Sequence, residues 1–363
     1  MVGAIETAEA LARTLAGAAA GWRFTVTSSA GLSMGIDHWE MGGAYSPPRK
    51  TQTISGSAFI VWGDHSISRG TVDANTLGRL TQQVAAWKST SYQDDEASYI
   101  APVAEPAAVE LADPRVAAVA LSNPKPAFDT LAAISRAARA SGVRTLDAGV
   151  SCSAGDTVTA SSSGLWAHYS HTSLSCGWVL DSAFGMTRLG RAIEMWKGIE
   201  PLVESTAKML SASRHRVNLA GGGMRVILWP AVVDQLIQHY LFHNLSGEMV
   251  AEGRTRFSIE DFRRGRKAFR EDISIHLDTT LPLGPGSYPC TAEGIPGGRV
   301  TLAHRGALVA PLLSLKYSRR TGMDPTPLPA AGMGPGHAGL RLRIGQGEPP
   351  PFDSMLRGTD RAL

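Results

Sequence analysis

Runs of alternating apolar and polar residues, separated by turn residues, recur along this chain and are typical of β-strands. They cover residues 22–45, 53–72 and 143–183, and they return from residue 273 onward. Patterns typical of helices lie at the start of the chain and over 73–90, 126–141 and 199–213. Because several strands follow one another before each helix, without a strict strand–helix alternation, the sequence predicts an α+β fold.

Turn residues divide these runs into shorter predicted strands. Turns are expected at Ser28–Gly31, at Gly63–Asp64 and at Gly155–Asp156. Residues 91–114, which are acidic and contain proline, are predicted to be an exposed excursion. Residues 311–322 follow the strand pattern of the C-terminal part, and residues 321–351, rich in glycine and proline, are expected to be irregular.

The length of 363 residues predicts two domains. We expect an N-terminal domain over residues 1–215, a mixed antiparallel sheet with helices, and a β-rich C-terminal domain over 216–363. Hydrophobic residues make up 43% and charged residues 18%, as in soluble globular proteins. No apolar run approaches the roughly 18 residues of a membrane span.

The net charge and the cysteine content indicate which binding partners and which cellular compartment to expect. The net charge is only +3, and acidic residues interrupt the locally basic segment 254–272, so nucleic acid is not an expected partner. The three cysteines, Cys152, Cys176 and Cys290, form no CxxC pair and are expected to be buried. The first residues carry Glu6 and Glu9 and lack the pattern of a signal peptide, which favours the cytoplasm.

Two histidines, His239 and His243, lie four residues apart on a helix predicted to begin at Pro230. That spacing places both side chains on one face, as in zinc sites of the HExxH type. Here Tyr240 follows His239, so the glutamate that serves as base in such sites is missing. Two histidines also leave zinc without enough ligands, so a structural or interface role is favoured.

Other motifs do not supply a catalytic site. The run Gly221–Gly223 precedes a predicted strand, the wrong order for a phosphate-binding loop that follows a strand and opens a helix. The segment "ASSSGLWAHYS" resembles GxSxG only loosely and lacks the strand–turn–helix context of a nucleophilic serine. His168 and His171, three apart on a predicted strand, point to opposite faces.

Several segments resemble the TldD/PmbA (TldE) metallopeptidase family. They are "SGEMVAEGRTRF", "LDTTLPLGPGSYPCTAEGIPGGRVTLAHRGALVAPLLSLKYSRRTGM" and "GLRLRIGQGEPPPFDSMLRGTDRAL". In the second of these, the resemblance implies a glycine-rich turn, a hairpin and a tyrosine-bearing helix that ends in glycine. The family continues beyond a segment like Thr359–Leu363 into further β-strands, so the resemblance also implies an incomplete C-terminal domain, with a sheet edge that needs covering.

The resemblance implies that this chain itself binds no zinc. Zinc-carrying TldD-type subunits bear His-Glu-x-x-x-His on the helix that contains His239, and a cysteine in the last strands completes their site. In this chain the corresponding positions hold Asp234, Gln235 and His239, so only the second histidine is retained. We therefore expect no catalytic residue and no metal ligand in this chain. His239, His243, Asp234 and Gln235 are candidates for a cavity or an interface.

Two functions remain open at this point. The first is a TldE/PmbA-like subunit of a heterocomplex in which a TldD-type partner supplies zinc and hydrolyses peptides or peptide-like amide conjugates. The second is a non-catalytic binding or scaffold protein derived from the family, and self-association is possible in both. The alanine- and arginine-rich composition is typical of GC-rich bacteria, in which such pairs also serve natural-product biosynthesis.

Overall fold

The computed structural model describes residues 3–43, 46–214, 241–327 and 341–344, together with the single residues 226, 232 and 354. The chain divides into two compact units, hereafter unit 1 and unit 2. Unit 1 comprises Met1–His215 and Thr280–Pro296, and unit 2 comprises Arg216–Thr279 and Gly297–Leu363. The predicted C-terminal domain 216–363 differs from unit 2 by the segment 280–296.

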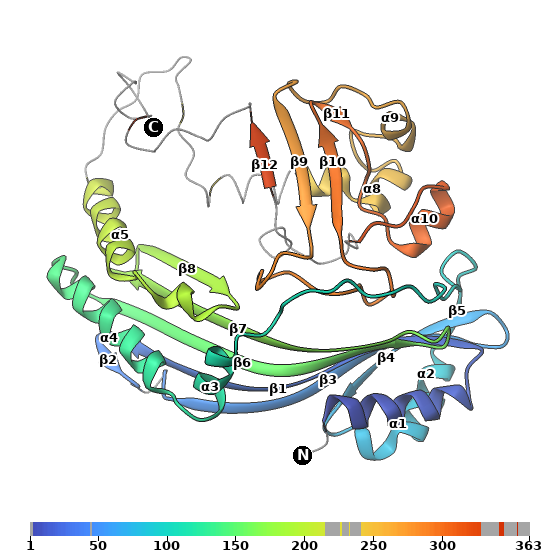
Figure 1. Cartoon of the computed structure of the whole chain (residues 1–363), viewed down its shortest axis with the longest axis horizontal. Coiled ribbons are helices and arrows are strands. Elements are labelled where there is room, and N and C mark those ends of the chain that lie inside the picture. Colours follow the sequence, from blue (N-terminus) through green and yellow to red (C-terminus); the bar gives the residue numbers. More distant parts are fainter. Residues whose placement is uncertain are drawn as a thin grey trace. The chain divides into compact units, whose positions relative to one another are not determined.

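Unit 1 is built on one antiparallel sheet in the order β5-β4-β3-β1-β6-β7-β8, with β2 paired to β1 (Figure 1). Its strands are β1 (Gly21–Asp37), β2 (Glu40–Met41), β3 (Arg49–Val61), β4 (Ser66–Asp73), β5 (Tyr92–Gln93), β6 (Leu146–Ser161), β7 (Trp166–Leu180) and β8 (Phe184–Gly190). Its helices are α1 (Ala4–Ala16), η1 (Leu77–Arg79), α2 (Leu80–Ser89), α3 (Pro114–Leu121), α4 (Lys125–Ala140), η2 (Ile193–Trp196) and α5 (Glu200–Ser213).

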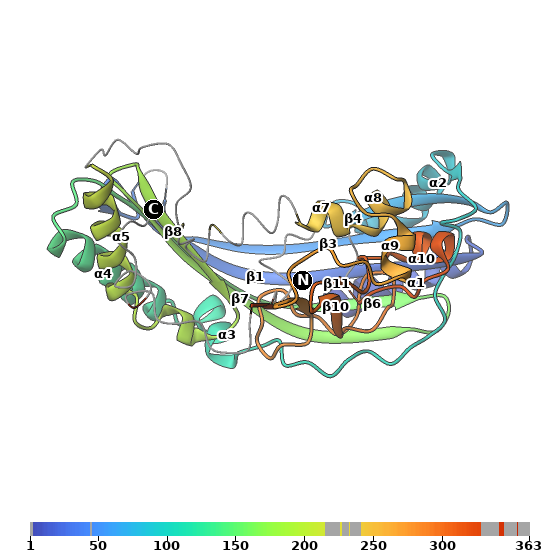
Figure 2. The same ribbon diagram turned by 90° about the horizontal axis from the view of Figure 1, so that it is seen from above.

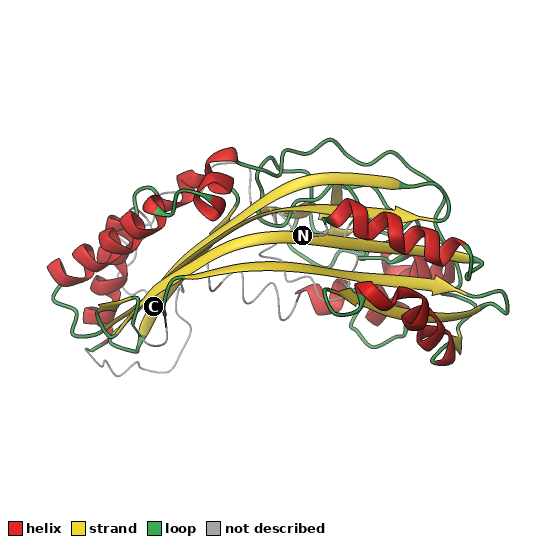
Figure 3. Cartoon of the chain, turned by 90° about the horizontal axis from the view of Figure 1, so that it is seen from below, coloured by secondary structure: helices red, strands yellow, loops and turns green. Residues whose placement is uncertain are grey.

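Helices cover one face of this sheet in two separate groups (Figures 2 and 3). The group α1 and α2 packs on Trp22, Phe24 and Val26 of β1 and their neighbours. The group α3, α4 and α5 packs further along the same strand, on Leu32, Met34 and Ile36. Because side chains alternate along a strand, these even-numbered residues of β1 share the apolar face. The α+β prediction is confirmed.

The predicted turns at Ser28–Gly31 and Gly155–Asp156 are wrong. Both segments lie inside long strands, since β1 and β6 are paired without a break from Arg23↔Ser161 to Ile36↔Ala148. The serine, alanine and glycine residues of β1 fall in the stretch between the two helix groups. They need no large apolar side chain there, and a composition that resembles a turn is therefore compatible with a strand.

Unit 2 contains a smaller antiparallel sheet in the order β11-β10-β9-β12. Its strands are β9 (Ile273–Asp278), β10 (Arg299–His304), β11 (Ala307–Leu308) and β12 (Arg341–Ile344), and its helices are α7 (His243–Leu245), α8 (Gly247–Ala251), α9 (Ile259–Arg263) and α10 (Leu315–Thr321). The strand predicted over 311–322 is wrong, because α10 lies there and ends at Gly322, which has a φ of 67°. The family resemblance had implied this helix.

Segment 280–296 connects β9 to β10, two strands of unit 2, but it belongs to unit 1. Backbone bonds connect it to the excursion 91–113: the Ala107 N–H donates to the Pro289 carbonyl, and the Leu283 N–H donates to that of Glu110. Arg23 forms an ion pair with Glu293 at 3.0 Å, with both side chains largely buried. Cys290 packs with Leu165 and Ala167 in a small apolar cluster.

Arg191 holds this segment through carbonyl oxygens. Its Nε donates to the Gly284 oxygen at 2.9 Å and its Nη2 to the Ser287 oxygen at 3.2 Å, while its Nη1 donates to the Thr172 oxygen on β7 at 3.0 Å. Burial lowers the pKa of the guanidinium from its ordinary value. No ion pair joins it to a carboxylate of the described residues, so these bonds are its main compensation for lost hydration.

We predict that Arg191→Met destabilises unit 1 by about 2–4 kcal/mol, because it leaves several buried carbonyls without a donor. Urea unfolding followed by tryptophan fluorescence measures this, since seven of the eight tryptophans lie in unit 1. The control Arg136→Met removes an exposed pair with Glu200 at 3.7 Å and should cost less than about 0.5 kcal/mol. Equal effects of the two variants would contradict the role given to Arg191.

Candidate functional site

The residues singled out by the sequence are only partly described. Asp234, Gln235 and His239 lie outside the described residues, so their shared helix face remains a prediction. His243 is described: it is exposed and begins α7 in unit 2. The chain after it is fixed firmly, because the Gly247 N–H donates to the Leu312 carbonyl at 2.7 Å and the Leu312 N–H donates to that of Leu245.

The three cysteines lie in apolar surroundings. All are buried in unit 1, as predicted. Burial raises the pKa of each thiol to about 11. A thiol in this state is protonated and weakly nucleophilic at neutral pH. Within the described part of unit 2, no group of three or more histidine, cysteine or acidic side chains comes together.

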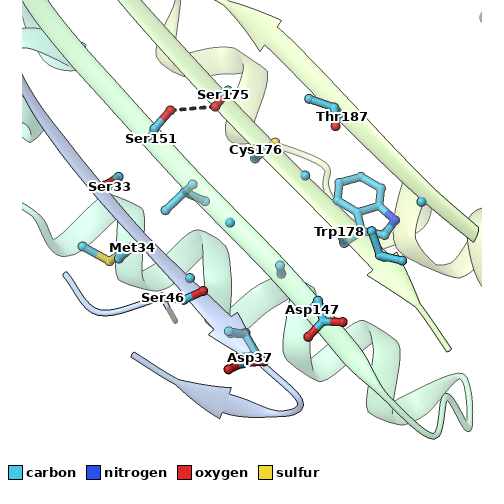
Figure 4. Close-up of a pocket in the computed structure, with 18 of the residues that line it drawn as sticks. Ser33, Met34, Asp37, Ser46, Asp147, Ser151, Ser175, Cys176, Trp178 and Thr187 are labelled. Carbon is cyan, nitrogen blue, oxygen red and sulfur yellow. Dashed lines mark hydrogen bonds between the residues drawn. The ribbon is translucent and has the colours of Figure 1, made fainter. Parts of the chain in front are cut away.

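A cavity of about 740 Å³ lies on unit 1. It opens on the face of the sheet opposite the helices and spans β1, β6, β7 and β8 (Figure 4). This volume lies within the range of small-molecule and peptide sites. The residues that line it are Ser33, Met34, Gly35, Ile36, Asp37, Ser46, Pro47, Arg49, Asp147, Ala148, Gly149, Val150, Ser151, Ser175, Cys176, Gly177, Trp178, Val179, Gly185, Met186 and Thr187.

The face that carries the cavity is unusually rich in hydroxyl groups. Pairs of hydroxyls bond across neighbouring strands: Ser151 to Ser175 at 2.7 Å, and Thr27 to Thr157 at 2.9 Å. The Ser151–Ser175 pair lines the cavity itself (Figure 4). Such pairs stabilise adjacent strands. Apolar side chains, among them Val179 and Met186, also line the cavity, so it offers both hydrogen-bonding and apolar surface.

Two carboxylates, Asp37 and Asp147, line one end of the cavity and lie near each other in Figure 4. His38 joins them: its Nδ1 lies 2.7 Å from the Asp37 Oδ1 and 3.4 Å from the Asp147 Oδ1. The hydrogen bond to Asp37, followed by the charge of Asp147, raises the pKa of His38. The three side chains lie close enough to share a cation, but a cluster of this kind is common without one.

A strained hairpin holds His38 in this place. Asp37 pairs with Glu40 across a two-residue turn, and His38 and Trp39 have φ values of 46° and 73°. Hairpins of this type usually place asparagine or glycine there, because left-handed backbone is costly for other residues. Compensation comes from the Trp39 indole, which donates to the Arg144 carbonyl at 2.7 Å and lies under the Arg139 guanidinium at 4.3 Å.

Sequence reasoning missed this site because its parts are distant in the chain. Asp37 and Asp147 come together only through the pairing of β1 with β6. A usable signal was nevertheless present. Gly35, Gly149 and Gly177 each lie inside a predicted strand, where glycine is disfavoured and often marks the close approach of another group.

We predict that the pKa of His38, measured by NMR titration, lies above 6.5. Asp37→Asn should lower it more than Asp147→Asn does, because the hydrogen bond to Asp37 is the larger cause. The control Asp129→Asn, which removes an exposed partner of Lys125, should leave it unchanged. The charged form contributes stability at low pH, and this contribution is lost as the pH rises through the pKa of the folded state. A pKa unaffected by either cluster substitution would refute the geometry.

Comparison with known proteins identifies relatives of the whole fold. TldE from Thermococcus kodakarensis superposes with a TM-score of 0.75 at 14% identity, over 98% of this chain and 81% of that one. A proposed modulator of DNA gyrase from Bacteroides thetaiotaomicron gives 0.78 at 13% identity, over 100% and 82%. Another from Thermotoga maritima gives 0.77 at 15%, over 98% and 81%. At these identities the similarity establishes the fold.

The sequence itself matches a family model over its C-terminal part. Residues 221–363 match the PmbA/TldA metallopeptidase C-terminal domain, whereas no curated protein matches the chain. None of the helices in the described ranges is both long and apolar enough to cross a membrane. The family model over residues 221–363 and the fold shared with TldE agree with the resemblance of the sequence to the TldD/PmbA metallopeptidase family.

Proposed function

We propose that this chain is the TldE-type subunit of a two-chain peptidase, in which a TldD-type partner carries the zinc and the general base. The observation that carries the proposal is the residue content of positions 234–239. Asp234 and Gln235 stand where the zinc-carrying subunits have histidine and glutamate, and His239 alone matches. Without a metal there is no water of lowered pKa to attack an amide.

Further observations support a zinc-free chain. The three cysteines are buried and belong to unit 1, whereas the segment that the resemblance associates with zinc, residues 234–239, belongs to unit 2. The fold is shared with a protein named TldE. In this proposal the complex acts on peptides or peptide-like amide conjugates, and His239, His243, Asp234 and Gln235 line the shared cavity or interface.

Zinc content is the first test. The chain purified without chelator or nickel resin should contain well under one zinc per molecule by elemental analysis. A complex with a TldD-type partner should contain one zinc per pair, and His239→Ala and His243→Ala in this chain should leave that value unchanged. If the isolated chain holds about one zinc that His239→Ala removes, the chain is itself a metalloprotein and the proposal fails.

Activity is the second test. The isolated chain should not cleave an unfolded peptide such as reduced casein, whereas the mixture should cleave it and lose this activity with a chelator. The matched control is the mixture in which the partner's HExxxH glutamate is replaced by glutamine, which should be inactive. Chelator-resistant cleavage by the chain alone would refute the proposal. Absence of any stable complex would favour the alternative of a binding or scaffold protein.

A further inference from the structure

A second cavity of unit 1, hereafter the helix cavity, lies between α1 and α2 and has a volume of about 700 Å³. Both helices cover the same face of the sheet (Figure 3). The C-terminal part of α1, the residues that follow β3, and α2 line this cavity. Its volume lies within the range of sites for small molecules. It shares no residue with the cavity on β1, β6, β7 and β8.

The floor of the helix cavity is apolar. Trp62 and Val84 belong to the core beneath α1 and α2, and each is only 4% exposed. The polar edge of Trp62 is already satisfied, since its Nε1 donates to the Ser68 Oγ at 3.0 Å. Small residues, Gly63 and Ala85, stand beside this floor, and a Cβ built on Gly63 meets no heavy atom within 4 Å. An apolar group can therefore enter and be removed from water.

Two cations, Arg13 and Lys88, also line the helix cavity. The Lys88 Nζ lies 2.7 Å from the Asp64 Oδ2 and 5.1 Å from the centre of the Trp62 ring. Its charge is thereby compensated. Arg13 is exposed, and within the described ranges no ion pair includes it, although Glu9 precedes it by one turn. Two cations and one carboxylate leave a single net positive charge at this site.

Both cations also stand in the last turn of their helices, where backbone carbonyls carry partial negative charge. That attraction requires only proximity, so it leaves the N–H donors of the exposed Arg13 guanidinium available to another acceptor. A guanidinium binds a carboxylate through two parallel hydrogen bonds. One net positive charge matches a monoanion, whereas a phosphate dianion would retain a negative charge.

We propose that the helix cavity binds a small monocarboxylate with an apolar body. The carboxylate pairs with Arg13, and the apolar body lies over Trp62 and Val84, in the open space beside Gly63 and Ala85. The site lies within unit 1 alone and requires neither zinc nor a partner subunit.

Isothermal titration of the full-length chain with 1-naphthoate and with the uncharged 1-naphthamide, which has nearly the same shape, tests the charge requirement. Naphthoate should bind at about one site per chain and at least about fivefold more tightly than the amide, because only the carboxylate forms a charge-assisted pair. This preference should shrink at high salt, since Arg13 is exposed. Equal binding of the two compounds, or no binding of naphthoate, would overturn the proposal.

Arg13→Gln identifies the cation. It should abolish the preference for naphthoate and leave the binding of naphthamide unchanged. The matched control Arg136→Gln removes another exposed arginine, on α4 and outside this cavity, and should keep the preference. If Arg13→Gln lowers the melting temperature but keeps the preference, Arg13 serves only the end of α1, and the proposal is wrong.

Two neighbouring alanines of α2 test the position of the apolar body. Both Ala85 and Ala86 are exposed, but only Ala85 lines the helix cavity. Ala85→Phe should fill the space above the floor and weaken both compounds at least about tenfold. Ala86→Phe adds the same side chain outside the cavity and should bind both as the parent does. Unchanged binding by a folded Ala85→Phe variant would contradict the placement.

Discussion

Backbone hydrogen bonds hold β1 on both edges, with β3 over Gly21–Ser33 and with β6 over Arg23–Ile36. Fixed on both sides, the strand cannot slip, because a shift of one residue would exchange its two faces. Trp22, Phe24, Leu32 and the other even-numbered apolar residues are thereby directed to the helices. The odd-numbered residues present hydroxyls, glycines and Asp37 on the opposite face, and the cavity follows from the same pairing.

Local sequence patterns were sufficient to predict those elements whose structure depends on residues close together in the sequence. The helices near residues 4–16, 80–89 and 125–140 could be predicted from their apolar periodicity, and the burial of the cysteines from their isolation. The composition of Ser28–Gly31 predicts a turn that does not form, because residues typical of turns also suit a strand between two separate cores. The carboxylates Asp37 and Asp147 could not be brought together by inspection, since only sheet register over 110 residues does so.

The segment around His239 and the cavity on β1, β6, β7 and β8 lie in different parts of the sequence and use different residues. In the proposed function, zinc belongs to the partner, because Asp234 and Gln235 stand in this chain where the resemblance implies a histidine and a glutamate in zinc-carrying subunits. The cavity with its carboxylates and hydroxyls belongs to unit 1, and neither His239 nor His243 lines it. The cavity and the segment that contains His239 therefore depend on different residues, and substitutions can test them separately.

The Arg191 contacts have a consequence for biogenesis. Residues 1–215 leave the ribosome before segment 280–296 exists, so the carbonyls of Gly284 and Ser287 and the partner of Arg23 are still absent. At about 5–20 residues per second, the nascent sheet waits roughly 4–16 s for residue 296. During that interval Arg191 must remain hydrated and Leu165 uncovered. Completion of unit 1 is therefore a late event of translation, although most of its sequence comes first.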